Sequence, residues 1–256
     1  MPDPLRQDSR VTTKPPARPA KPPRHGVART ISKLGLGSRT EAARWVRDGR
    51  VRVNGQLVLD SDFPVRQGLD SIDIDGQQSA PARRLVLMLN KPRGLVTTTK
   101  DEKGRDTVYS CFADAQLPWL APVGRLDKAS EGLLLFTNDP VWAARITDPS
   151  SGPAKTYHVH IDRLPDASLL VALEQGALLD GESLVVKSAR CLRTGRKNAW
   201  LEIELAAGRN RQIRRLLASF DVSVLRLVRV AVGPLSLGKL PKAQWRMLTE
   251  QEINSL

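Results

Sequence analysis

The chain has 256 residues and a formal net charge of +13 at pH 7, with a sequence pI near 10.3. This length allows one sizeable domain and a smaller one, and the positive charge favours a polyanionic partner, although simple solubilising charge would look the same. Two distant cysteines, Cys111 and Cys191, and the lack of any apolar run of about eighteen residues argue against a disulfide framework and a membrane-spanning helix, so we expect a cytoplasmic protein without a signal peptide.

Residues 1–24 contain seven of the eighteen prolines and six Lys or Arg against two Asp. A segment of this composition buries no core, so we predict a disordered basic tail. Such a tail can hold a polyanion loosely, and a passive tail fits the sequence nearly as well.

Residues 25–80 are predicted to form a small basic module whose folded part begins near Val27. A turn is expected at Gly37-Ser38, then a helix over 39–48 that ends at Gly49, where a glycine suits a helix C-terminus. Strands over 51–53 and 56–59 form a hairpin around Asn54-Gly55, and a further strand covers 72–75. From 29 to 53, seven Lys or Arg accompany two acids; from 54 to 80, one Arg accompanies five Asp.

A linker over 76–84 is expected to lead into a larger domain, which we place at residues 81–256. Strands are predicted over 85–89, 132–136, 156–161, 184–189, 199–205 and 222–230, and helices over 140–146 and 210–219. Because strands outnumber helices and short connections join several of them, we expect an α+β fold on a mainly antiparallel or mixed β-sheet.

The segment from Gly124 to Asp139 is the first that indicates chemistry. A loop with an arginine, Arg125, and a carboxylate, Asp127, precedes an apolar stretch that is typical of a buried strand. Loops held by buried strands often carry catalytic groups. Taken alone, however, a turn cap or an ion pair with Arg125 explains Asp127 more simply.

Alternation in the strand over 156–161 places Tyr157 on one face and the two histidines, His158 and His160, on the other. A tyrosine beside basic residues suits stacking on a base, and an ordinary core tyrosine fits equally well. No third metal ligand has a suitable spacing, so exposed strand histidines are the preferred interpretation.

The helix over 210–219 has a buried stripe that includes Ile213 and Leu216. At roughly 100° per residue, Arg211 and Arg215 point away from this stripe, toward solvent or phosphate, whereas Arg214 lies at its border. A border arginine can reach a partly buried carboxylate.

The segment "SKLGLGSRTEAARWVRDGRVRVNGQLV" resembles the small RNA-binding module of ribosomal protein S-four. The resemblance implies that the basic helix and the following hairpin dock on RNA phosphates. For any single side chain a solvated surface charge is the simpler interpretation, but the cluster as a unit favours RNA. Its members are Lys33, Arg39, Arg44, Arg47, Arg50 and Arg52.

From Leu85 onward, "LNKPRGLVTT", "VGRLDKASEGLLLFTND", "KTYHV" and "GRNRQIRRLL" resemble the Rsu-type pseudouridine synthases in motif and order. The resemblance implies that Asp127 is the catalytic aspartate and that Tyr157 packs against the target base. It further implies that Arg214 is the basic partner of the aspartate, that Arg125 fills the space left by a flipped nucleotide, and that Leu216 lines the pocket.

The implied activity is isomerisation of a specific uridine in ribosomal RNA, with large-subunit RNA favoured. It requires base flipping and breakage and re-formation of the glycosidic bond, with no cofactor and no metal. The implied partner is ribosomal RNA or a pre-ribosomal particle, and we expect a monomer without a membrane partner. Two alternatives remain: a non-catalytic RNA-binding or ribosome-assembly factor, and a hydrolytic glycosidase, which would need paired carboxylates that the sequence does not identify.

Overall fold

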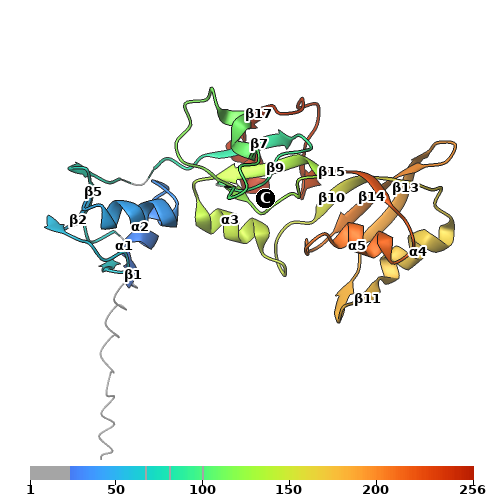
Figure 1. Ribbon diagram of the computed structural model, residues 1–256, viewed down its shortest axis with the longest axis horizontal. Coiled ribbons are helices and arrows are strands. Elements are labelled where there is room, and N and C mark those ends of the chain that lie inside the picture. Colours follow the sequence, from blue (N-terminus) through green and yellow to red (C-terminus); the bar gives the residue numbers. More distant parts are fainter. Residues whose placement is uncertain (1–23, 67, 81, 100) are drawn as a thin grey trace, which may run out of the picture.

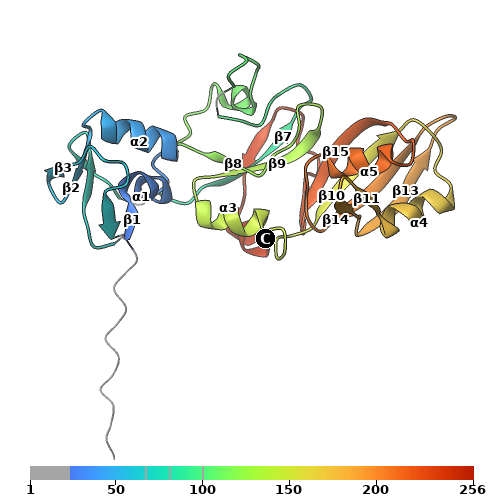
Figure 2. The same ribbon diagram turned by 60° about the horizontal axis from the view of Figure 1, so that its bottom comes forward.

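The computed structural model describes residues 24–66, 68–80, 82–99 and 101–256. Figures 1 and 2 show three parts in a row: an N-terminal module, a central part around β9, and a C-terminal part around β10, β13 and β14. The predicted tail lies outside the described residues except for Arg24, which belongs to strand β1 (Arg24–Gly26). Strand β1 pairs with β4 (Pro64–Arg66), so the ordered module begins before Val27.

The N-terminal module packs two helices against a small sheet. The predicted helix is confirmed as α2 (Arg39–Arg47), whose start is fixed by a capping box between Ser38 and Glu41. Helix α1 (Val27–Lys33) was not predicted; it has seven residues and no side-chain cap, so it depends on packing against α2. The four sheet strands, in spatial order, are β3 (Gln56–Leu57), β2 (Val51–Val53), β5 (Ile72–Ile74) and β6 (Gln77–Gln78).

The expected linker over 76–84 begins later than predicted. Strand β6 lies within that range and pairs with β5, because a turn at Asp75-Gly76 reverses the chain. Beyond it, the Ala82 N–H donates to the Leu34 carbonyl oxygen, so the connection also contacts the module.

The larger domain is built on a nine-stranded sheet, which confirms the predicted mixed sheet. Its main path is β13-β14-β10-β15-β9-β7-β17, with β16 beside β15 and β8 beside β9. The pairs are antiparallel except for β9 and β15, which run parallel. The strands are β7 (Val86–Lys91), β8 (Ala121–Val123), β9 (Glu131–Thr137), β10 (Lys155–Ile161), β13 (Ser188–Thr194), β14 (Ala199–Leu205), β15 (Val224–Val232), β16 (Leu235–Ser236) and β17 (Trp245–Met247).

Within the described part of this domain, the helices that accompany the sheet are α3 (Pro140–Thr147), α4 (Ala167–Gln175), α5 (Gln212–Ala218) and α6 (Glu250–Ser255). A 3-10 helix covers Val108–Phe112, and β11 (Ala177–Leu179) pairs with β12 (Glu182–Leu184). The predicted strand over 184–189 is wrong, because its apolar residues belong to the end of β12 and the start of β13. Helix α5 starts two residues later than predicted, since Arg211 adopts a left-handed conformation with φ 48°.

The cores lie on both faces of β9, and this explains why all seven residues of that strand are buried. Strand β10 instead alternates as predicted: Tyr157, Val159 and Ile161 are buried against α4 and α5, whereas the intervening residues are half-buried. At the parallel β9–β15 contact, Gly132 has φ +99° and a Cβ there would lie 2.2 Å from the Arg229 carbonyl oxygen. Only glycine permits this close approach of the two strands.

Candidate active site

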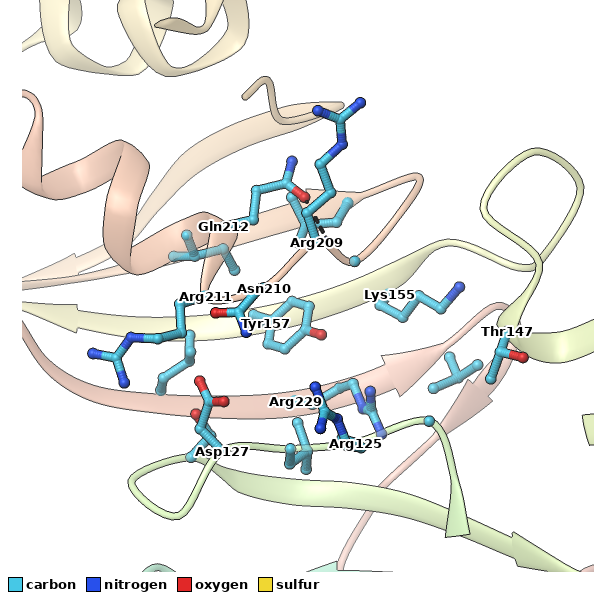
Figure 3. Close-up of a pocket in the computed structure, with 18 of the residues that line it drawn as sticks. Arg125, Asp127, Thr147, Lys155, Tyr157, Arg209, Asn210, Arg211, Gln212 and Arg229 are labelled. Atoms are coloured by element: carbon cyan, nitrogen blue, oxygen red, sulfur yellow. Dashed lines mark hydrogen bonds between the residues drawn. The ribbon is translucent and has the colours of Figure 1, made fainter. Parts of the chain in front are cut away.

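A pocket of about 330 Å³ opens where the central and C-terminal parts meet. The loop before β9, the strands β10 and β15, and the turn before α5 form its walls (Figure 3). The parallel pairing of β9 with β15 sets this geometry, because it places the start of β9 beside the middle of β15. Segments that are about a hundred residues apart in the chain therefore line one cavity.

The fully buried side chain of Lys91 fixes the backbone of the loop that carries Asp127. The Lys91 ammonium donates to the carbonyl oxygens of Asp127 at 3.2 Å and Ser130 at 2.8 Å. Thr97 Oγ1 donates to the Leu126 carbonyl oxygen at 2.7 Å, which fixes the other side of the loop. Burial lowers the pKa of Lys91 to about 8, against the attraction of nearby carboxylates. Sequence reasoning missed Lys91, although a lysine that ends an apolar strand was a visible signal.

Asp127 is exposed and lines the pocket. In Figure 3 its carboxylate points away from its own loop, toward the strand that carries Tyr157 and the turn that carries Arg211. Among the described residues, no ion pair joins Asp127 to Arg125 or Arg214. The carboxylate is therefore available to a molecule in the pocket.

Tyr157 lies where both interpretations that its sequence left open can apply. Its side chain belongs to the hydrophobic core and is 8 % exposed, yet it also lines the pocket. A ring that is held by the core and reaches the pocket forms a rigid apolar part of its wall.

Arg214 is placed by two backbone oxygens. Its guanidinium donates to the carbonyl oxygens of Val224 at 3.1 Å and Ala129 at 3.4 Å, and its Nε is buried without a partner in the described part of the chain. Burial lowers the pKa of Arg214, as does repulsion from Arg211, while attraction by Asp127 opposes both. Arg214 thus acts on the aspartate loop through its charge and through the Ala129 carbonyl, without a direct ion pair.

The structure does not bring Leu216 to the pocket. Leu216 of α5 is fully buried in the core, and the aliphatic lining of the pocket instead includes Leu205, Ile213 and Leu227. The left-handed turn before α5 also redirects Arg211, which lines the pocket. Arg215, expected to face solvent or phosphate, instead pairs with Glu182 at 2.6 Å.

Positive charge surrounds the single carboxylate of the pocket. Burial lowers the pKa of Lys155, and repulsion by Arg229 lowers it further. The inward position of Arg229 was visible in the sequence, because alternation along β15 places it on the face of Leu227. The cations that line the pocket are Arg125, Lys155, Arg209, Arg211 and Arg229.

In the N-terminal module the six predicted RNA contacts differ in availability. Arg39, Arg44 and Arg47 are exposed on α2. The other three already have intramolecular partners: Arg50 with Asp75 at 2.9 Å and the Trp45 ring, Arg52 with the Gly55 carbonyl oxygen, and Lys33 with His25.

Two findings concern the described residues only. They contain no group of three or more His, Cys, Asp or Glu side chains that could hold a metal ion. Within the same residues, no helix is both long and apolar enough to cross a membrane.

The pocket and the basic module coincide with two family models. The RNA pseudouridylate synthase model matches residues 85–219, more than half of the chain, and the S4 domain model matches residues 27–70. The chain belongs to the RNA pseudouridylate synthase family. This pseudouridylate synthase is therefore an isomerase, and the resemblance to Rsu-type enzymes is confirmed.

Individual relatives agree with the family models. An uncharacterized RNA pseudouridine synthase of Aquifex aeolicus is 34% identical, over 90% of this chain and 92% of its own length. The ribosomal large subunit pseudouridine synthase B of Bacillus subtilis is 31% identical, over 90% of this chain and 94% of its own length. A crystal structure of a pseudouridylate synthase matches with a TM-score of 0.63 and 30% identity, covering 90% of this synthase and 99% of that chain.

Proposed function

We propose that this chain isomerises a specific uridine of ribosomal RNA, with large-subunit RNA favoured, and that Asp127 is its catalytic carboxylate. The observation that carries the proposal is one exposed carboxylate on a rigidly held loop, in a pocket that Tyr157 and five cations line. The name of the Bacillus subtilis relative supports ribosomal RNA as the substrate class.

The chemistry needs one carboxylate and a shaped pocket. The bond between ribose C1′ and base N1 breaks, the base turns, and C1′ bonds to C5. The C5 hydrogen then leaves as a proton and N1 takes up a proton, so that the product is an isomer of the substrate. Asp127 can attack C1′ as a nucleophile or remove a proton at C2′ as a base. The uridine leaves its stack at a cost of roughly a few kcal/mol, which contacts in the pocket offset.

The residues in and beside the pocket have roles that follow from their places. Tyr157 packs against the flipped base, and Arg125, exposed at the mouth, occupies the gap that the base leaves in the helix. Arg214 orients the aspartate loop through the Ala129 carbonyl oxygen. The pocket cations hold the flanking phosphates, since Arg and Lys recognise phosphate oxygens through charge-assisted hydrogen bonds.

We propose that residues 25–80 bind RNA and that residues 81–256 perform the chemistry. The exposed arginines of α2 are the strongest phosphate contacts of the first part. We further propose that the protein acts in the cytoplasm, as a monomer, on ribosomal RNA or a pre-ribosomal particle.

The test uses ribosomal RNA transcripts labelled with tritium at uridine C5. The wild-type chain should release tritium without freeing uracil, and Asp127→Asn should release none while it binds RNA as before. Asp114→Asn is the matched control, because Asp114 is exposed and does not line the pocket. Binding without release would indicate an assembly factor, and free uracil would indicate a glycosidase; either result contradicts the proposal.

The ribosomal subunit is tested separately. Pseudouridines are mapped in both ribosomal RNAs of a strain that lacks this chain and of the same strain complemented with it. We expect one large-subunit pseudouridine to disappear and to return with the wild-type chain but not with Asp127→Asn. Loss of a small-subunit pseudouridine instead would contradict the assignment to the large subunit.

A further inference from the structure

A row of aromatic and basic side chains crosses the sheet on the face opposite the pocket. Strand pairing aligns Arg193 of β13 with Trp200 of β14, Trp200 with His160 of β10, and His160 with Arg226 of β15. We call these four residues the aromatic–basic row. Because side chains alternate along each strand, the row lies on the face away from Tyr157, Leu201 and the active-site pocket.

The row is ordered around the indole of Trp200. The ring of His160 stacks on it with the centroids 4.8 Å apart and an interplanar angle of 4°. The guanidinium of Arg193 lies 5.3 Å from the indole centroid and that of Arg226 lies 5.9 Å away, both within cation–π range. Trp200 and His160 are only half-buried, so part of this surface remains accessible.

This face is an open part of the sheet. Helices α4 and α5 pack against the other face of β10 and β14, where Leu173 of α4 and Leu217 of α5 belong to the core (Figures 1 and 2). Beside the row is a shallow hollow whose lining includes Leu192, Val228 and Trp200 itself. The exposed apolar area is small, which disfavours a hydrophobic protein interface as its purpose.

The carboxylates near the row are already neutralised. Glu131 is buried and pairs with Arg226 and Lys242, at 2.7 and 2.6 Å. Glu202 pairs with Arg190 at 2.7 Å and lies 3.3 Å from His158.

Further positive charge lies at the turn between β13 and β14. Arg196 and Lys197 are exposed there, next to the exposed Arg193. The surface around Trp200 therefore carries an excess of positive charge with an aromatic centre.

We propose that the aromatic–basic row binds an unpaired nucleotide of the RNA substrate, outside the active-site pocket. The identity of the ligand as RNA rests on the proposed function. Bases of single-stranded RNA stack on aromatic side chains while neighbouring cations hold the backbone, and this row supplies both on one rigid sheet. RNA that enters the pocket on one face of the sheet and reaches the row on the other face would contact both sides of the C-terminal part of the protein.

The test is ultraviolet cross-linking of the full chain to a short labelled oligouridylate, with the adduct mapped to its peptide. The wild-type chain should form an adduct on the β14 peptide that contains Trp200. Base stacking on one aromatic ring contributes about tenfold or more to affinity, so Trp200→Leu should lower that adduct by about tenfold, and Trp200→Phe should retain most of it. Trp119→Leu is the matched control, because Trp119 is half-buried and belongs neither to the row nor to the active-site pocket.

A second variant separates a loss of nucleotide binding from a loss of stability. Arg193 is exposed, so Arg193→Gln should leave the melting temperature unchanged and still lower the Trp200 adduct several-fold. Cross-linking needs no turnover, and therefore a failure of the proposed isomerase activity would leave this result intact. Absence of an adduct on the β14 peptide would overturn the proposal. The proposal would also be wrong if the same variants lost binding to ribosomal proteins that are free of RNA.

Discussion

The buried ammonium group of Lys91 donates a hydrogen bond to the backbone carbonyl oxygen of Asp127, at 3.2 Å. The same nitrogen contacts the carbonyl oxygens of Pro92 and Ser130. A single cation thus ties the end of β7 to both ends of the loop that presents the carboxylate. The loop owes its position to a side chain that is outside the pocket.

Lys91→Met should therefore lower turnover while leaving RNA affinity unchanged. Without the three donated hydrogen bonds the loop can shift, and a displacement of about 1 Å at a reacting group costs roughly a hundredfold in rate. The measurement is single-turnover tritium release at saturating RNA, with binding followed in parallel. Equal losses in binding and in turnover would show that Lys91 supports the whole fold and not the loop alone.

The same lysine predicts an alkaline limit to activity. Burial lowers the pKa of Lys91 to about 8, so the ammonium loses a proton as the pH rises through that value. The neutral amine has two donors for three carbonyl oxygens, and the turnover rate should fall above about pH 8. In a pH–rate profile of Lys91→Met this alkaline decline should be missing. A decline with the same midpoint in the variant would assign it to another group.

Arg214→Leu should lower turnover by about a hundredfold, because the Ala129 carbonyl loses its donor and Asp127 loses a nearby positive charge. Arg214→Lys should recover only part of the rate, since it keeps the positive charge and loses the fork that reaches two carbonyl oxygens at once. The measurement is single-turnover tritium release at saturating RNA. Turnover of Arg214→Leu near the wild-type rate would show that Arg214 does not support the Asp127 loop.

Arg44→Gln combined with Arg47→Gln should weaken RNA binding and flatten its salt dependence. Each phosphate contact contributes about 0.9 to the slope of log affinity against log salt on a duplex, so the slope should drop by up to about 1.8. Arg50→Gln is the comparison, because Arg50 already pairs with Asp75 and should change the slope less. Single-turnover rates at saturating RNA should stay near wild type. A double variant with an unchanged slope would remove α2 from the RNA interface.

The ion pairs of Glu131 should make the free energy of unfolding depend on pH in the acid range. Burial alone raises the pKa of Glu131, but hydrogen bonds from Arg226 and Lys242 outweigh it and hold the pKa at about 2. The folded state thus binds this proton less tightly than the unfolded chain. The contribution of Glu131 to the free energy of unfolding is complete above its ordinary pKa of 4.5 and is lost as the pH falls toward 2. Urea unfolding of wild type and Glu131→Gln should show a stability difference that shrinks over this pH interval; a constant difference would contradict the assignment.

Gly132→Ala should destabilise the protein by about 3 kcal/mol or more, since the new Cβ would meet the Arg229 carbonyl oxygen at 2.2 Å in addition to a positive φ. Gly55→Ala is the matched control: its φ is also positive, but a Cβ there meets nothing within 4 Å. The control should lose only about 1 kcal/mol. Equal losses in the two variants, measured by urea unfolding, would show that the β9–β15 contact relaxes freely.

Local patterns in the sequence determined those features that depend on near neighbours along the chain. The turn at Gly37-Ser38 and the helix over 39–48 located α2, and the alternation around Tyr157 identified both faces of β10, because turns and side-chain periodicity need only a few adjacent residues. The loop of Asp127 stood out for the same reason, as a polar segment before an apolar strand.

Only the tertiary structure decided which distant groups meet. The parallel pairing of β9 with β15 brings the Asp127 loop to Arg229, and nothing within either strand specifies that partner. The conformation of Arg211 turned it into the pocket, whereas helical periodicity had pointed it outward. Lys91 and Trp200 likewise owe their roles to strand register, since hydrogen bonding and stacking across a sheet depend on chain segments far apart in sequence.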